Sequence, residues 1–223
     1  MTANYDQEVN MSTKTAFINF LLEYKALKFG EFKLKSGRVS PYFFNLGVFN
    51  TGKSLHTLGH HFAHALRDAN FKYDMLFGPA YKGIPLVCST AVALYQEHQQ
   101  DTPYCFNRKQ KKEYGDGGDL VGTPLQGNVV MFDDVITAGT TVRETIELVS
   151  HYNATLSGIV IAFDRQERGT STLSAVQEVE QHYKIPVKSI LCLTDILNYL
   201  EHKNEYKDAK TSILEYQALW GIE

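Results

Sequence analysis

Two adjacent carboxylates close a strongly apolar run in the middle of the chain. The residues VVMF at 129–132 are followed by Asp133 and Asp134, then by a short loop pattern and a helical pattern from Thr141. In open parallel sheets, ligands bind at the carboxyl ends of strands, and the free amides at the start of a helix bind anions. The segment therefore predicts a phosphate site in the loop, with the two acids directed to sugar hydroxyls or to a metal ion.

The loop that follows the acids makes this pattern specific. It includes Gly139, which lets the backbone approach a ligand closely, and threonines that add hydroxyl groups. A receiver-like acidic pocket, or a plain strand–helix turn with threonine caps, is the alternative. The candidate binding residues are Asp133, Asp134, Val135, Ile136, Thr137, Ala138, Gly139, Thr140 and Thr141.

A second loop, GPAYKG at 78–83, follows another apolar run. Its glycines and Pro79 are typical of a tight turn whose amides could face a pyrophosphate, and Lys82 adds a cation. The loop is not a Walker motif, because no Gly-Lys-Ser/Thr follows. A surface turn with a solvated lysine is the alternative.

Four cations precede three glycines in the segment 107–119: Arg108, Lys109, Lys111 and Lys112. The segment has no apolar period, so it predicts a long loop. It could be a mobile lid that brings positive charge to a pyrophosphate, although such charge runs are more often solvated loops.

A carboxylate-recognising group is expected near the apolar run 156–163. Arg165 directly follows that run, and its planar fork suits a carboxylate. Phe43 and Phe44 could bracket a flat ring. The alternatives are that the two phenylalanines belong to the core and that Arg165 pairs with Glu167 on the surface.

Three histidines, His56, His60 and His64, have the i, i+4, i+8 spacing of metal ligands on a helix. They point away from the predicted apolar stripe, and no cysteine or carboxylate joins the row in the sequence. A solvated helix face is therefore favoured over a zinc site. The three cysteines form no CxxC pair, which indicates neither a disulfide framework nor a zinc site and favours a reduced, cytosolic location.

Alternating strands and helices must position these residues. Strands are expected at 71–77, 104–106, 129–132, 156–163 and 187–193, and helices at 84–95, 141–151 and 174–183. Such alternation predicts an α/β fold with a central parallel sheet flanked by helices. Before this region, the pattern predicts a helix capped by Ser12, a hairpin formed by 29–34 and 39–44, and a helix from Leu55 to near Asn70; after it, closing helices are expected at 195–200 and 212–220.

Length and charge limit the remaining possibilities. With 223 residues, the chain predicts a single domain over 12–223, with a hood from about 12–50 plus C-terminal elements, and residues 1–11 as a disordered extension. Its 22 basic and 25 acidic residues give a net charge of −3, which argues against a dedicated binder of nucleic acid or of anionic membranes. The sequence contains no signal-peptide pattern and no apolar run long enough to span a membrane.

The chain resembles the orotate phosphoribosyltransferases, a family with the type I phosphoribosyltransferase fold. The segment 129–141 is similar to the phosphoribosyl-pyrophosphate signature of that fold. Five further motifs occur in the family's order: LKSGR at 34–38, SPYFFN at 40–45, FGPAYKGIP at 77–85, FNRK at 106–109 and DRQERG at 164–169. The resemblance covers nearly the whole chain after Met11.

The resemblance implies an enzyme that joins orotate to the ribose of 5-phosphoribosyl 1-pyrophosphate. The products are orotidine 5′-phosphate and pyrophosphate, in the penultimate step of pyrimidine (UMP) synthesis. It also implies Mg²⁺ as cofactor and a cytoplasmic homodimer in which a catalytic loop reaches into the partner's site. Lys112, Asp133 and Asp134 would be the catalytic residues.

The resemblance also implies substrate-binding roles for a set of positions, several of which the residue types already indicate. They are Lys35, Phe43, Phe44, Tyr81, Lys82, Arg108, Lys109, Tyr114, Thr137 and Arg165. A non-proline cis peptide is implied between Ala80 and Tyr81. One position departs from the family, because Tyr114 stands where a histidine is common.

Two other functions remain as alternatives. A purine phosphoribosyltransferase would share the phosphate loop but would not need Arg165 or the Phe43-Phe44 hairpin. A regulator that senses the sugar phosphate and binds nucleic acid should carry a basic face, which the net charge of −3 argues against.

Overall fold

The computed structural model describes residues 2–34, 36–112, 118–169 and 171–222, and for 2–12 and 111–112 it describes the backbone alone. The chain forms two compact units. Unit 1 comprises Met1–Phe49, Arg165–Ser174 and Leu191–Glu223, and unit 2 comprises Asn50–Asp164 and Ala175–Ile190. In the part that the structure describes, no helix is long and apolar enough to cross a membrane.

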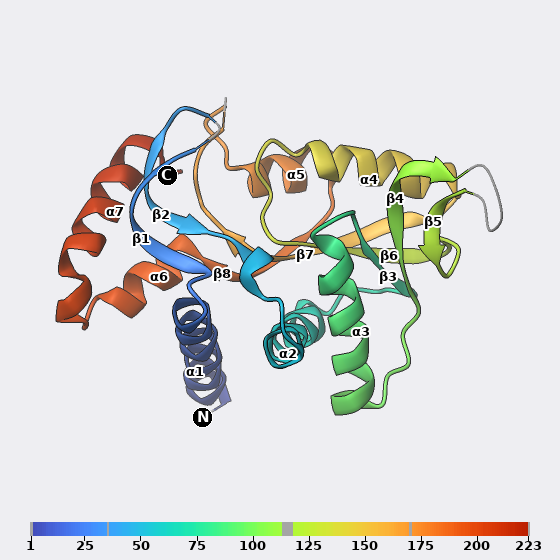
Figure 1. Ribbon diagram of the computed structural model, residues 1–223, viewed down its shortest axis with the longest axis horizontal. Coiled ribbons are helices and arrows are strands. Elements are labelled where there is room, and N and C mark those ends of the chain that lie inside the picture. Colours follow the sequence, from blue (N-terminus) through green and yellow to red (C-terminus); the bar gives the residue numbers. More distant parts are fainter. Residues whose placement is uncertain (1, 35, 113–117, 170, 223) are drawn as a thin grey trace. The chain divides into compact units, whose positions relative to one another are not determined.

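Unit 2 is built on a six-stranded sheet with the order β5-β4-β3-β6-β7-β8 (Figure 1). Neighbouring strands are parallel from β4 through β3 and β6 to β7, whereas β5 pairs antiparallel with β4. The predicted α/β fold with a mainly parallel sheet is thus confirmed. The strands are β3 (Met75–Gly78), β4 (Tyr104–Lys112), β5 (Gly118–Gly122), β6 (Asn128–Asp133), β7 (Thr155–Asp164) and β8 (Val187–Cys192).

Helices cover both faces of this sheet, with α4 and α5 on one face and α2 and α3 on the other (Figure 1). Residues of β6 alternate between the two layers: Met131 belongs to a core cluster with Val142 of α4, whereas the ring of Phe132 lies 6.0 Å from that of Phe62 of α2. Burial on both faces explains why the run VVMF is continuously apolar. The helices are α2 (Gly52–Ala69), α3 (Gly83–His98), α4 (Thr140–His151) and α5 (Ala175–Tyr183).

Unit 1 combines the two ends of the chain with a two-stranded antiparallel sheet. Lys14 of α1 and Asp195 of α6 form an ion pair at 2.8 Å, which joins residues 181 positions apart. Tyr42 of β2 is fully buried, as is Ile213 of α7. The elements are α1 (Thr2–Glu23), β1 (Leu27–Lys33), β2 (Val39–Phe44), η1 (Leu46–Val48), α6 (Leu193–Leu200), η2 (Asn204–Tyr206) and α7 (Lys207–Trp220).

Two expectations for secondary structure need correction. Helix α1 begins at Thr2, so Ser12 is not its N-cap and residues 2–11, expected as a disordered extension, are helical. The segment 2–23 contains no proline or glycine that would end a helix before Ser12.

The predicted loop 107–119 is strand as far as Lys112. Strand β4 pairs with β5 from Cys105 opposite Gly122 to Lys112 opposite Gly118. A backbone ladder at the sheet edge does not require apolar side chains, so a charged sequence without an apolar period can still form it. The tip, 113–117, lies outside the described residues.

Candidate active site

The carboxyl end of β6 holds two buried acids. Asp133 is 9% exposed and Asp134 4%. The Asp134 amide donates to Asp133 Oδ1 at 2.8 Å, and the Val135 amide donates to Asp134 Oδ1 at 3.0 Å. The Asp134 carbonyl accepts from two amides of β7, at 3.1 and 3.2 Å. These bonds hold both carboxylates in place where the strand ends.

Burial raises the pKa of the Asp133 carboxyl to about 7, and the neighbouring Asp134 carboxylate adds to the rise. Lys82 acts in the opposite sense on the Asp133 pKa. The ammonium of Lys82 pairs directly with Asp134 Oδ2. The site therefore combines one acid neutralised by a cation with one that titrates near neutral pH.

The loop after the acids is open to solvent where the sequence predicts a phosphate. Thr137, Ala138 and Thr140 are exposed, and Gly139 has a φ of 68°, which favours glycine. Gly139 makes no side-chain cap, so it leaves the first amides of α4 available to an anion.

In the predicted binding segment, Val135, Ile136 and Thr141 are buried or half-buried rather than exposed. Ile136 belongs to the sheet core and Val135 is half-buried. The Ile136 side chain is committed to packing, so only its backbone is available to a ligand. Thr141 is half-buried at the start of α4.

The loop 78–83 brings Lys82 to the end of β6. The predicted cis peptide between Ala80 and Tyr81 is present. The Ala80 amide donates to Asn107 Oδ1 of β4 at 2.7 Å, which ties the loop to the neighbouring strand. A Cβ on Gly78 would lie 2.2 Å from the Gly83 carbonyl oxygen, so the turn closes too tightly for any other residue. Tyr81 is 72% exposed.

Two cations of β4 have different environments. Lys109 and Asn107 line a hollow with Pro79, Ala80 and Thr141. Arg108 lies between them in the part of β4 whose pairing with β5 is irregular. Its Nε is buried and has no hydrogen-bond partner among the residues that the structure describes. Tyr114 and the side chain of Lys112 lie outside the described part.

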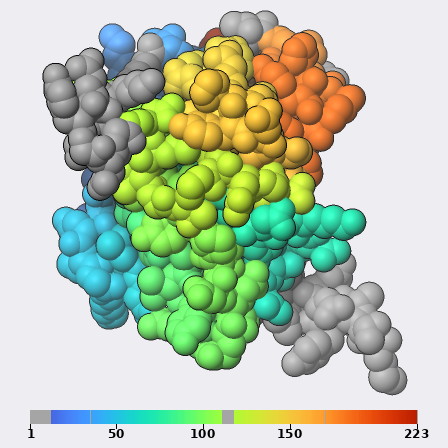
Figure 2. Space-filling model, turned by 90° about the vertical axis from the view of Figure 1, so that its right-hand side faces the viewer, coloured from blue at the N-terminus to red at the C-terminus, as the bar shows by residue number. Residues whose placement is uncertain are grey.

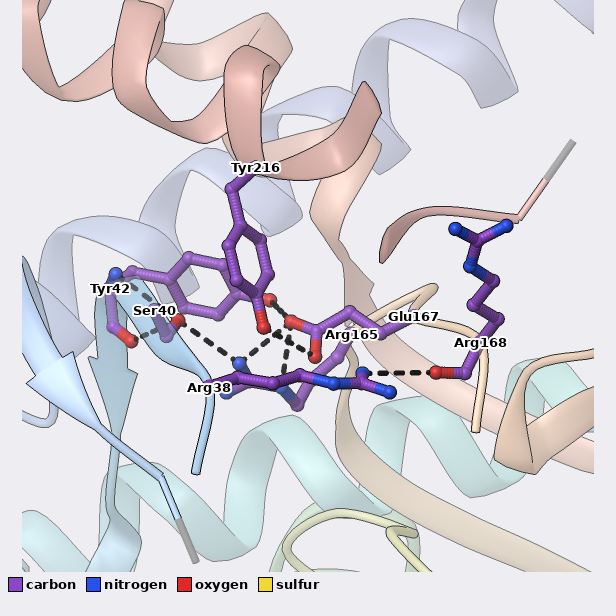
Figure 3. Close-up of polar contacts among 7 residues, drawn as sticks. All are labelled: Arg38, Ser40, Tyr42, Arg165, Glu167, Arg168 and Tyr216. Carbon is purple, nitrogen blue, oxygen red and sulfur yellow. Dashed lines mark hydrogen bonds and ion pairs between the residues drawn. The ribbon is translucent and has the colours of Figure 1, made fainter. Parts of the chain in front are cut away.

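Unit 1 holds Arg165 in a polar cluster (Figure 3). Arg165 donates from Nε and Nη2 to Glu167 Oε1, at 3.0 and 2.7 Å, and from Nη2 to Ser40 Oγ at 3.2 Å. Its guanidinium carbon lies 4.4 Å from the centre of the Tyr42 ring. The side chain is only 15% exposed, so the pair with Glu167 is buried rather than a surface contact.

Tyrosines complete this cluster from two other elements. Tyr42 of β2 donates to Glu167 Oε1 at 2.6 Å, and Tyr216 of α7 donates to Glu167 Oε2 at 3.2 Å. Burial raises the pKa of the Tyr42 phenol well above its usual range, so it remains a donor. The sequence indicates the Arg165–Glu167 pair as an alternative, and the pair is present but buried. It does not single out Tyr42 and Tyr216, because their separation along the chain hides their contact with this pair.

The other predicted base contacts are less tightly placed. Phe43 is 37% exposed and its ring lies 5.4 Å from that of Phe32 at 28°, so it is not a core residue. Phe44 is half-buried. Lys35 lies outside the described residues.

Comparison with known proteins adds independent information. Residues 48–188 match the family model described as the phosphoribosyl transferase domain. The orotate phosphoribosyltransferase of Photorhabdus laumondii is 55% identical over 206 residues, which cover 92% of this chain and 97% of that protein. That of Yersinia enterocolitica is 53% identical over 206 residues, with coverages of 92% and 97%.

A solved structure agrees with these relatives. The crystal structure of the orotate phosphoribosyltransferase of Francisella tularensis is similar with a TM-score of 0.84 and 40% identity. The likeness covers 92% of this chain and 99% of that one. The similarity therefore includes the segments of both units.

Proposed function

The chain belongs to the orotate phosphoribosyltransferases, and from this membership we propose that it transfers ribose 5-phosphate from 5-phosphoribosyl 1-pyrophosphate to orotate. The products are orotidine 5′-phosphate and pyrophosphate, in pyrimidine synthesis. The observation that carries the assignment is the Lys82–Asp134 pair beside the open start of α4. No finding favours the purine-transferring or regulatory alternatives.

Unit 2 would bind the sugar pyrophosphate. The free amides of α4 and the hydroxyls of Thr137 and Thr140 suit the 5-phosphate. Asp133 and Asp134, at the end of β6, would orient the ribose hydroxyls. Lys82, which pairs with Asp134, would contact the pyrophosphate.

The reaction needs charge neutralisation rather than a nucleophile of the protein. Breaking the ribose–pyrophosphate bond leaves an oxocarbenium-like sugar and a polyanion. Lys82, Lys109 and Lys112 would stabilise the leaving group, together with Arg108. The unpaired buried donor of Arg108 supports this role, because a buried guanidinium donor without a partner is costly until an anion binds. Tyr114 would add a neutral hydrogen bond.

Unit 1 would recognise orotate. Glu167 and Ser40 hold the Arg165 guanidinium in one orientation, and Tyr42 supports its face. A fixed, largely buried fork is suited to bind a carboxylate through two bonds. Phe43, Phe44 and Lys35 would complete the contacts of unit 1 with the base.

Mg²⁺ is proposed as cofactor because phosphoribosyltransferases generally use it with the sugar pyrophosphate. Asp133 and Asp134 are hard oxygen donors that fit this ion, but both are buried and Asp134 is paired with Lys82. The ion would therefore be held mainly by substrate oxygens and water, which the two acids would orient. When bound, Mg²⁺ would neutralise charge on the pyrophosphate.

A homodimer is proposed from the family and from the surface of α3. Val92 and Tyr95 are each 55% exposed on this helix, which belongs to the green region in the lower centre of Figure 2. Large exposed apolar side chains that lie close together mark interaction surfaces. A cytoplasmic location remains a prediction.

A substrate panel tests the proposed function. Purified protein with the sugar pyrophosphate and Mg²⁺ should consume orotate and leave uracil, adenine and hypoxanthine unchanged. Turnover of a purine instead of orotate would overturn the assignment.

A further inference from the structure

A carboxylate completes the histidine row of α2. Glu97, near the end of α3, places Oε1 2.8 Å from His60 Nδ1 and Oε2 3.4 Å from His64 Nε2. One ligand atom from each of the three residues lies within 4.8 Å of the others. The sequence favours a solvated face because no carboxylate joins the row, and the structure supplies one from another helix.

The spacing of these atoms suits a transition-metal ion. Zinc binds imidazole nitrogen at about 2.0–2.1 Å in tetrahedral geometry, which places donor atoms about 3.4 Å apart. The separation of His64 Nε2 from Glu97 Oε2, 3.4 Å, equals that value, and that of His60 Nδ1 from Glu97 Oε1, 2.8 Å, would lengthen by about 0.6 Å on coordination. Two histidines and one glutamate, with water in the fourth position, form an established type of zinc site.

Close packing fixes the two helices that carry the ligands. Gly59 precedes His60, and a Cβ on it would lie 2.4 Å from the Ser89 carbonyl oxygen of α3. The helices therefore approach too closely for a larger residue. The site is held on rigid elements rather than on loops, which favours a defined coordination geometry.

A fourth imidazole lies beside the three ligands. The His98 ring is 5.7 Å from the His64 ring, and His98 Nε2 is 4.0 Å from Glu97 Oε2. This Nε2 is buried and has no hydrogen-bond partner among the described residues. At this distance it faces the Glu97 carboxylate without belonging to the three ligands.

We propose that His60, His64 and Glu97 bind a divalent transition-metal ion of the zinc class. The site is independent of the transferase centre, since none of its residues belongs to the phosphate loop or to the Arg165 cluster. Imidazole nitrogens disfavour Mg²⁺, which prefers oxygen. The bound ion would link α2 to α3 and stabilise the folded chain without taking part in catalysis.

Calorimetric titration of the metal-free protein with Zn²⁺ tests the proposal. We expect one ion per chain, with no heat attributable to this site from Mg²⁺. His64→Ala and Glu97→Gln should each weaken Zn²⁺ binding at least about tenfold, because loss of even an outer-shell partner of a ligand typically costs about 10–100-fold. His56→Ala, on the same helix and exposed, is the matched control and should leave the affinity unchanged.

Co²⁺ separates this site from adventitious binding to thiols. Nitrogen and oxygen ligation gives visible bands without thiolate-to-metal charge transfer, and His64→Ala should abolish them. Zn²⁺ should also raise the melting temperature of the wild type but not that of His64→Ala, while transferase activity with Mg²⁺ stays equal in both. Equal Zn²⁺ affinity in wild type and both ligand variants, or a Co²⁺ spectrum dominated by thiolate, would refute the proposal.

Discussion

At the scale of single residues, the site depends on charges whose partners the fold supplies. Lys82 reaches Asp134 across 52 positions of sequence. Arg165 has its carboxylate partner only two residues away, at Glu167. Sequence motifs identify Lys82 and Arg165, but the tyrosines that surround Arg165 come from β2 and α7. Such contacts depend on tertiary packing, so no local pattern reveals them.

The raised pKa of Asp133 makes stability depend on pH. The pKa of the Asp133 carboxyl is about 7 in the folded chain, against an ordinary value of 3.8. Between these two pH values, the folded chain therefore binds a proton that the unfolded chain has lost. The free energy of unfolding should therefore fall as pH rises from about 4 to 7. Asp133→Asn, which keeps an oxygen for the Asp134 amide, should flatten this fall and raise stability at pH 8 by on the order of 1–3 kcal/mol.

Urea unfolding at pH 5, 6, 7 and 8 measures this slope. Asp101→Asn, at an exposed position, is the control and should follow the wild type. An unchanged slope in Asp133→Asn would show that this buried carboxyl does not titrate in the window.

At the scale of elements, the sequence predicts the sheet strands and helices that carry the site because their patterns are simple. Buried parallel strands such as β6 and β7 are nearly continuously apolar. Helix α4 begins at Thr140, at the end of the predicted phosphate segment. Strand β4 is the exception, because its ladder with β5 depends on backbone bonds that leave no trace in side-chain periodicity. Helix α1 shows a different kind of error. Ser12 has the residue type of an N-cap, but the helix begins at Thr2 and continues through Ser12.

Strand β4 also supports the loop 78–83, the proposed pyrophosphate site, through Asn107. Asn107→Ala removes the acceptor of the Ala80 amide, a hydrogen bond of about 0.5–1.5 kcal/mol. The Michaelis constant for the sugar pyrophosphate should rise about three- to tenfold, with little change for orotate. Gln110→Ala, exposed on the same strand, should match the wild type in steady-state kinetics. An unaltered constant in Asn107→Ala would mean that this bond does not position the loop.

At the scale of the whole molecule, the chain passes between its units beside a predicted binding residue. Asp164 ends β7 in unit 2, and Arg165 begins the next segment of unit 1. Unit 2 is proposed to bind the sugar pyrophosphate and unit 1 to bind orotate. Sequence motifs predict residues of both binding sites, but only the structure shows that these residues belong to two separate units.

The proposed homodimer can be tested by complementation. Lys112→Ala and the double variant Asp133→Asn/Asp134→Asn should each lose activity by roughly a hundredfold or more. If the β4–β5 segment acts in the partner's site, heterodimers contain one intact site, and an equal mixture should recover about a quarter of wild-type activity. Verified heterodimers without recovery would show that each chain completes its own site.

The central claim is that the two substrates bind to different units of the chain. Michaelis constants for both substrates in two variants test it most directly. Arg165→Lys keeps the charge but loses the planar fork, so the constant for orotate should rise about tenfold or more while that for the sugar pyrophosphate changes little. In Lys82→Ala, the constant for the sugar pyrophosphate should rise while that for orotate changes little. Arg38→Lys, in unit 1 outside the proposed contacts, serves as the control. Equal losses for both substrates in Arg165→Lys, or an effect of Lys82→Ala on orotate alone, would contradict the account.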